Sequence, residues 1–168
     1  MPITVSLIGM PGAGKSTVGV LLAKHLGLNF VDTDLLIQVR HQASLQDIMD
    51  RMGYLHLRQL EEEVLLDMPL ADSLVSTGGS AVYSSAAMAR LGAAGPLVHI
   101  DVPLTVLKNR IDDEDGRGIA RPKGQDLAAV FAEREPLYQT FADFTVSAEN
   151  LSAEATARAI QHWLSQAR

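Results

Sequence analysis

The sequence predicts an α/β fold of three layers, in which helices cover both faces of a five-stranded parallel sheet. Short runs of β-branched and other apolar residues alternate along the chain with longer segments in which apolar residues recur every three or four positions. Such alternation is typical of parallel sheets, because two parallel strands need a crossover that is usually a helix. The 168 residues contain no repeat and no linker, so we expect one domain that spans residues 1–168.

The expected strands are short, and three of them end in residues that suggest a binding site. They are residues 3–8, 30–31, 74–76, 97–101 and 144–147. The first strand ends at Gly9, the second at Asp32 and the third at Gly78. Ligands of parallel sheets lie beyond the carboxyl ends of the strands, so we expect the functional site at this edge.

The segments between the strands mostly show helical spacing of their apolar residues. These segments are 18–26, 44–68, 103–111, 131–141 and 153–166. Gly27 ends the first helix, and Gly53 divides the second segment into two helices. Residues 112–126 are charged, contain glycine and have no apolar period, so we expect a mobile surface loop there.

The composition excludes several classes of protein. Hydrophobic residues make up 47% and charged residues 20%, as in ordinary globular proteins. The formal net charge of -6 disfavours nucleic acid as a partner, and the lack of cysteine excludes disulfides and thiolate metal sites. The five histidines are scattered without metal-ligand spacing. No apolar stretch is long enough for a membrane span, so we expect a soluble cytoplasmic protein, and a monomer.

A phosphate-binding loop follows the first strand. Residues 9–16 read GMPGAGKS and match G-x-x-x-x-G-K-[ST] at every position. Glycines allow successive backbone amides to point at one anion, and the following helix adds its positive N-terminal end. Lys15 can neutralise β- and γ-phosphate oxygens, and the Ser16 hydroxyl can bind Mg²⁺, so we expect ATP and Mg²⁺ as cofactors. The expected nucleotide-binding residues of this loop are Gly12, Ala13, Gly14, Lys15, Ser16 and Thr17.

Two aspartates follow the second strand. Asp32 can hold Mg²⁺ together with Ser16, directly or through water. Asp34, one pleat further on the same face, can accept a proton from an attacking hydroxyl or orient it. The alternative is that both aspartates only cap a helix that begins near Leu35.

With these aspartates the chain resembles the shikimate kinase family, which has the nucleoside-monophosphate-kinase-like P-loop fold. The likeness covers almost the whole chain. It rests on residues 9–19 and 30–34, on Gly53, Arg58 and Glu61, on the glycine turn at 76–82, and on residues 134–138, 142–143 and 146. The resemblance implies an ATP-dependent phosphotransferase that phosphorylates a hydroxyl of a small carboxylate, with shikimate as the best single candidate.

Carried over by position, the resemblance assigns further site residues. It implies that Asp34, Arg58, Gly78, Gly79, Ser80 and Arg134 bind the acceptor, within a region whose helices span about residues 33–68. Arg58 and Arg134 are suited to bind a carboxylate through two parallel hydrogen bonds. Arg110 would lie along the adenine, and Arg117 would come from a lid at about residues 112–126 and act in catalysis with Lys15 and Asp34.

The chain departs from the family pattern mainly on the acceptor side. The departures are Met49 and Leu57 in place of aromatic residues, Tyr54 in place of glutamate, Ser80 in place of the third glycine, and Arg117-Gly118-Ile119-Ala120 in the lid. Loss of two aromatic walls would change the pocket for a flat ring. The acceptor is therefore shikimate or a different small hydroxy acid or amino acid. A catalytically silent nucleotide-binding module is the other alternative, whereas the late R-x-P-L-Y element argues against gluconate or a nucleotide. We expect Glu61, Glu62 and Glu63 to form mostly a solvated helix face, although Glu61 could orient Arg58.

Overall fold

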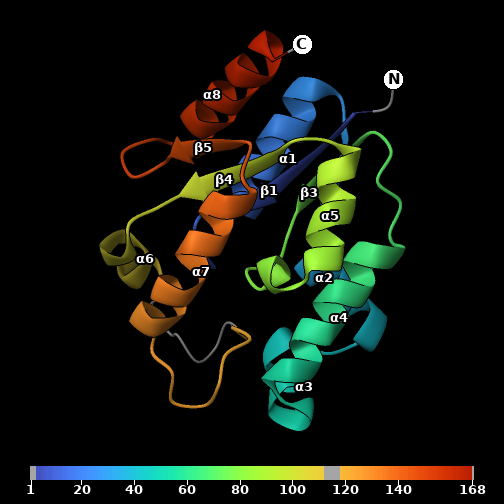
Figure 1. Ribbon diagram of the computed structural model, residues 1–168, viewed down its shortest axis with the longest axis vertical. Helices are drawn as coiled ribbons and strands as arrows, with labels where there is room; N and C mark the ends of the chain where they lie inside the picture. The colour runs from blue at the N-terminus through green and yellow to red at the C-terminus, as the bar shows by residue number, and fades with distance from the viewer. Residues whose placement is uncertain (1–2, 112–117, 168) are drawn as a thin grey trace.

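The computed structural model describes residues 3–111 and 118–167 and contains the five-stranded parallel sheet that the sequence predicts (Figure 1). The strands are β1 (Thr4–Ile8), β2 (Asn29–Asp32), β3 (Ser73–Ser76), β4 (Leu97–Asp101) and β5 (Phe144–Ser147). Their order in the sheet is β2-β3-β1-β4-β5, and Asp32 lies opposite Ser76 across the β2–β3 pair. The carboxyl ends of β1 and β2 therefore flank the end of β3, which brings three sequence-distant turns to one edge.

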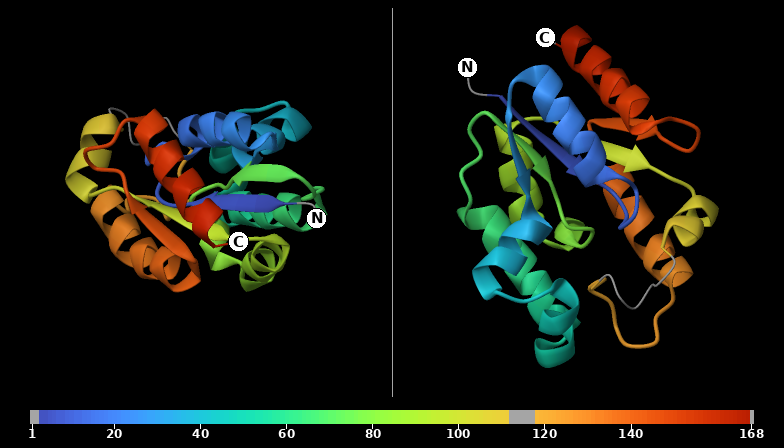
Figure 2. Two further views of the ribbon diagram at one scale, coloured as in Figure 1. Left: turned by 90° about the horizontal axis from the view of Figure 1, so that it is seen from above. Right: turned by 180° about the vertical axis from the view of Figure 1, so that it is seen from behind.

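Helices cover both faces of this sheet, as Figure 2 shows. On one face α1 (Lys15–Leu26) packs against α8 (Ala153–Gln166) and over β3. On the other face lie α5 (Ser85–Ala94), which contacts β1, and α7 (Leu127–Phe141), which contacts β4. The predicted three-layer architecture is therefore confirmed.

The core lies between these layers and is apolar. Val5, Leu7 and Ile8 of β1 are fully buried, as expected for a central strand covered on both faces. Gly19 lets α1 approach the sheet closely, because a Cβ atom at this position would lie 2.7 Å from the Phe30 ring. No helix in the described part of the chain is long and apolar enough to cross a membrane.

The remaining elements lie beyond or beside the carboxyl ends of the strands. They are α2 (Thr33–His41), α3 (Leu45–Met52), α4 (Tyr54–Asp67), the 3₁₀ turn η1 (Ala81–Tyr83) and α6 (Leu104–Arg110). Gly53 separates α3 from α4 with a φ of 87°, which confirms the predicted break. Ser44 begins α3 with a capping box to Asp47.

Three segments differ from the sequence-based expectation. The apolar pattern predicts no helix over residues 85–94, because this alanine-rich segment shows little helical contrast, yet α5 forms there with Ser84 as its N-cap. α7 begins at Leu127 rather than at residue 131, since the Asp126 side chain caps it by accepting from Ala129 N at 2.8 Å. The expected surface loop at 112–126 is partly wrong, because Ile119 and Ala120 are buried; residues 112–117 lie outside the described residues.

Candidate active site

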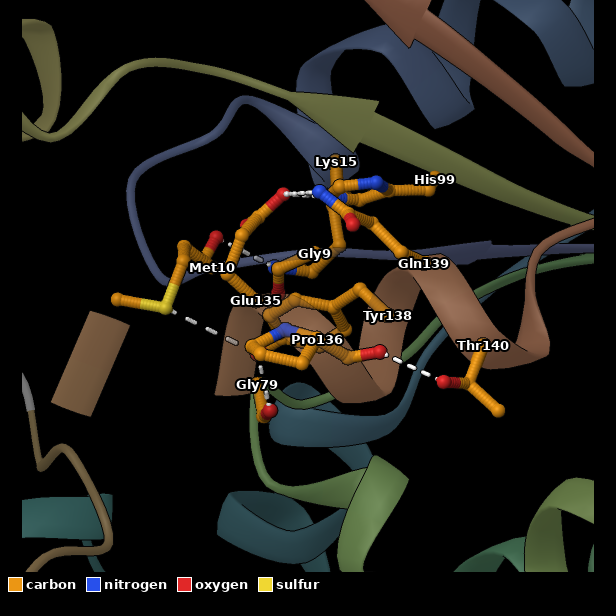
Figure 3. A network of polar contacts seen from close by, with 10 residues as sticks. All are labelled: Gly9, Met10, Lys15, Gly79, His99, Glu135, Pro136, Tyr138, Gln139 and Thr140. Carbon is orange, nitrogen blue, oxygen red and sulfur yellow. Dashed lines mark hydrogen bonds and ion pairs between the residues drawn. The ribbon is translucent and has the colours of Figure 1, made fainter. Parts of the chain in front are cut away.

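The phosphate-binding loop joins β1 to α1 and is shaped by its glycines. Gly12 and Gly14 have φ angles of 81° and 93°, in the left-handed region that other residues rarely adopt. The Lys15 ammonium group folds back over the loop and donates to the carbonyl oxygens of Gly9 at 2.8 Å and of Met10 at 2.9 Å, as Figure 3 shows. The loop therefore has the open backbone and the single buried cation that a phosphate group requires.

Burial changes the ionisation of Lys15. Its side chain is 8% exposed, and desolvation lowers its pKa to about 8, although the nearby carboxylates of Asp34 and Asp32 oppose this shift. The ammonium form therefore still predominates at neutral pH. A bound anion would stabilise this charge further.

Ser16 and Asp32 form a contact between the loop and the end of β2. Ser16 Oγ donates to Asp32 Oδ2 at 2.5 Å, while Asp32 Oδ1 accepts from the backbone N–H groups of Asp34 at 3.0 Å and Leu35 at 3.2 Å. Asp32 thus caps α2, as the alternative interpretation held, and also meets Ser16. One oxygen of this carboxylate therefore caps α2, and the other contacts the phosphate-binding loop.

Asp34 is placed differently from the expectation. It lies in the first turn of α2 and not one pleat further along a strand, because the cap at Asp32 begins the helix immediately after β2. Its Oδ1 atom is buried and has no hydrogen-bond partner among the described residues. Burial raises the pKa of this carboxyl group, and Lys15 opposes the shift.

A cavity of about 580 Å³ brings most of the predicted site residues together. The members that line it are Gly12, Gly14, Lys15, Ser16, Thr17, Asp34, Gly79, Ser80, Arg110 and Arg134. Arg110 donates to the Gly12 carbonyl oxygen at 3.2 Å. The cavity lining does not include the predicted residues Asp32, Arg58 and Gly78; Ala13 belongs to the apolar core, and Arg117 lies outside the described residues.

Gly78 lies between two carboxylates. A Cβ atom at this position would lie 2.8 Å from Glu61 Oε1 and 2.9 Å from Asp34 Oδ1, so a side chain cannot be accommodated without moving them. The expectation of a solvated face is wrong for Glu61, which is 5% exposed and accepts a hydrogen bond from the Ser80 hydroxyl. Burial and the neighbouring Asp34 raise the pKa of Glu61 to about 7. The two acids therefore form an electrostatically linked pair.

Two arginines from different helices converge on one oxygen atom. Arg134 of α7 is 1% exposed and donates through Nη2 to the Ala120 carbonyl oxygen at 2.7 Å. Arg58 of α4 donates to the same oxygen through Nε at 3.3 Å and Nη2 at 3.1 Å. Ala120 lines the cavity, whereas Arg58 reaches this oxygen from a smaller pocket beside it.

The sequence predicts no site role for Tyr83 or Tyr138, although Tyr138 belongs to the matched segment 134–138. Tyr83 contacts both arginines, but it follows Arg58 by 25 residues and no pattern in the sequence connects them. Tyr138 donates to the Gly79 carbonyl oxygen at 2.5 Å, and its ring stacks on His99 with centroids 5.3 Å apart. Leu57 is fully buried and does not line the cavity, so the substitution at this position does not alter the cavity wall directly.

His99 also lies in a group that its spacing in the sequence does not suggest. Its ring, Asp101 and Glu135 each offer a ligand atom, and these atoms lie within 4.8 Å of one another. Burial lowers the pKa of His99 to about 4, so the ring is neutral at physiological pH. The group adjoins the phosphate-binding loop, since a Cβ atom at Gly9 would lie 3.5 Å from His99 Cδ2, and Figure 3 draws His99 and Glu135 with Lys15 in one network of polar contacts.

Comparisons with known proteins agree with this geometry. The shikimate kinase family model matches residues 11–165. A shikimate kinase of Paracidovorax citrulli is 34% identical over 95% of this chain and 89% of its own length, and one of Halorhodospira halophila is 36% identical over 95% and 92%. The solved structure of the Acinetobacter baumannii shikimate kinase in complex with shikimate superimposes with a TM-score of 0.86 at 26% identity, over 99% of this chain and 95% of that one. The chain therefore belongs to the shikimate kinase family.

Proposed function

We propose that this chain transfers the γ-phosphoryl group of MgATP to a hydroxyl of shikimate, giving shikimate 3-phosphate and ADP. The observation that carries this proposal is the convergence of Arg58 and Arg134 on the Ala120 carbonyl oxygen, beside the cavity that contains the phosphate-binding loop. Two guanidinium groups directed at one point suit a carboxylate. The names of the curated relatives, and the shikimate bound to the A. baumannii enzyme, support shikimate as this carboxylate.

In the proposed reaction the acceptor oxygen bonds to the γ-phosphorus while the bond from that phosphorus to the β–γ bridging oxygen breaks. The hydroxyl proton passes to Asp34, whose Oδ1 atom is buried in the cavity and whose raised pKa suits a proton acceptor. Lys15 would exchange the carbonyl oxygens of Gly9 and Met10 for phosphate oxygens. Because such transfer involves little covalent chemistry with the protein, positioning and charge stabilisation supply most of the rate.

Ser16 and Asp32 fit a magnesium site. Their side-chain oxygens already lie 2.5 Å apart, and hydroxyl and carboxylate oxygens are ligands that Mg²⁺ favours. We propose that these two residues hold the ion, directly or through water. When bound, Mg²⁺ would neutralise charge on the β- and γ-phosphate oxygens.

The remaining assignments from the sequence also belong to this proposal. Arg110 would contact the adenine, and Arg117 would add positive charge during transfer. The acceptor carboxylate would replace the Ala120 carbonyl oxygen as the hydrogen-bond acceptor of Arg58 and Arg134. Helices within residues 33–68 would bind the acceptor, and residues 112–126 would form the lid. Since the loop, Asp34 and both arginines come from one chain, we propose that one domain and one monomer suffice.

The test is ADP release from MgATP in the presence of shikimate, gluconate, or hydroxy amino acids, each at the same concentration. We expect shikimate alone to stimulate ADP release. The Asp34→Asn variant gives the background rate of ADP release. That result would make Met49, Tyr54, Leu57 and Ser80 tolerated variation within an ordinary shikimate kinase. Turnover of another acid and not of shikimate would refute the choice of acceptor. ATP binding without stimulation by any acid would indicate a silent nucleotide-binding module.

A further inference from the structure

Arg58 is held between two aromatic rings. The carbon of its guanidinium group lies 3.9 Å from the centroid of the Tyr83 ring and 5.0 Å from that of Tyr54. Both distances are within the range of cation–π attraction, and the shorter one belongs to Tyr83. Tyr54 stands in the same helix as Arg58, whereas Tyr83 comes from η1.

The same Tyr83 also contacts the second arginine. Its hydroxyl oxygen accepts from Arg134 Nε at 3.4 Å and donates to Glu133 Oε1 at 2.5 Å. The Arg134 guanidinium carbon lies 5.4 Å from the centroid of the ring. One side chain therefore reaches both groups that meet at the Ala120 carbonyl oxygen, through its ring on one side and its hydroxyl on the other.

An aromatic ring positions an arginine without neutralising it. Among residues 3–111 and 118–167, no acidic side chain forms an ion pair with Arg58. A carboxylate in that position would compete with the carboxylate of an acceptor for the same donors, whereas a ring restricts the guanidinium plane and leaves its N–H groups available. Among the described residues, Glu61 and Glu133 therefore act on Arg58 only through space, without a direct ion pair.

The turn that carries Tyr83 also contacts Glu61, the acidic residue next to Arg58 on α4. Glu61 lies one helical turn after Arg58 on α4, but the Ser80 hydroxyl donates to it. Ser80 is the N-cap residue of η1, and Tyr83 is the last residue of that turn. The short segment from Ser80 to Tyr83 thus engages Glu61 at one end and Arg58 at the other.

We propose that Tyr83 is a positioning residue for acceptor binding, whose ring orients Arg58 and whose hydroxyl orients Arg134. This inference rests on the proposed function, since it assumes that the two arginines bind the acceptor carboxylate. It assigns Tyr83 no part in nucleotide binding or in the transfer step.

The test compares three variants with the wild-type enzyme in steady-state kinetics. Tyr83→Leu removes ring and hydroxyl and should raise KM for shikimate about 10- to 30-fold. Tyr83→Phe keeps the ring and should restore most of this loss, leaving KM about threefold above wild type. Tyr54→Leu removes the more distant ring and should raise KM less than Tyr83→Leu. In all three, KM for MgATP and kcat at saturating shikimate should stay within about twofold of wild type.

Folding and binding are checked without turnover. ADP affinity, measured by titration calorimetry, should be the same in wild type and Tyr83→Leu, whereas stabilisation of the protein by shikimate in a thermal melt should shrink. The proposal is overturned if Tyr83→Leu leaves KM for shikimate unchanged, if it weakens ADP binding equally, or if Tyr83→Phe is as impaired as Tyr83→Leu. If wild type phosphorylates a different acid of the panel, the proposed acceptor is wrong and the same comparison on that acid decides the role of Tyr83. If no carboxylate is bound, both proposals fail.

Discussion

The nucleotide side and the acceptor side of the cavity are assembled in different ways. On the nucleotide side, the glycines, Lys15 and Ser16 lie within one short loop, and backbone conformation does most of the shaping. On the acceptor side, Arg58, Tyr83 and Arg134 come from α4, η1 and α7, and their contacts are between side chains. A backbone site can be specified by a local motif, whereas a side-chain site requires the complete fold.

This difference explains where the chain departs from its family. In the loop a substitution would change φ angles or remove the buried cation, and every position matches the motif. On the acceptor side, two of the positions that depart from the family pattern contact charged groups: the Ser80 hydroxyl donates to Glu61, and the Tyr54 ring flanks Arg58. The residues at these two positions differ from the pattern, whereas the charged residues Asp34, Arg58 and Arg134 match it.

The largest expected effect comes from a change at Asp34, whose charge acts on Lys15 of the nucleotide side and on Glu61 of the acceptor side. Asp34→Asn keeps the shape of the side chain but removes the proton acceptor, so kcat should fall about a thousandfold. ADP affinity should stay near the wild-type value, because the Asp34 side chain makes no hydrogen bond to the phosphate-binding loop and acts on Lys15 only through its charge. Coupled ADP-release kinetics and calorimetry measure the two quantities.

Asp67→Asn is the matched control, since this exposed aspartate pairs with Arg40 on the surface and does not line the cavity, and it should retain wild-type kcat. Asp34→Asn with wild-type turnover would contradict the proposed role of Asp34.

A second prediction concerns the pH dependence of stability on the acceptor side. Burial raises the pKa of Glu61 from its ordinary value of 4.5 to about 7, so between these two pH values the folded protein holds a proton that the unfolded chain has lost. The contribution of Glu61 to the free energy of unfolding should therefore fall as pH rises through this interval, by up to about 3 kcal/mol, and remain low above pH 7, while the lowered pKa of His99 acts in the opposite direction below about pH 6.5. Glu61→Gln should remove this contribution, so the difference in stability between the variant and wild type should grow in favour of the variant from pH 5 to pH 8.

Urea denaturation at pH 5, 6, 7 and 8 measures the effect. Glu63→Gln is the control from the same helix, because Glu63 is exposed, and its pH profile should follow that of the wild type. Identical profiles for Glu61→Gln and wild type would show that Glu61 is not the group responsible.

The comparison of the two sides also explains what could be predicted from the sequence. The sheet, the loop and the break at Gly53 follow from local patterns, and the structure confirms them. The burial of Glu61 could not be read from its position within three consecutive glutamates, because the partner Ser80 comes from another element. Tyr83 shows the same limit: nothing near it in the sequence marks it, and only the packing of η1 against α4 and α7 brings it to the arginines.

The smallest expected effect is that of Arg134→Lys, which distinguishes the acceptor side from the nucleotide side most clearly. Arg134→Lys keeps a positive charge on α7 but replaces the planar group with a single ammonium, which cannot donate to both the Ala120 oxygen and the Tyr83 hydroxyl in the same geometry. KM for shikimate should rise about tenfold, while KM for MgATP should change less than twofold. Arg40→Lys, an exposed exchange in α2, should leave both constants unchanged. An equal rise in both KM values would mean that Arg134 supports the whole cavity, and that the acceptor side is not the separate unit that its side-chain construction implies.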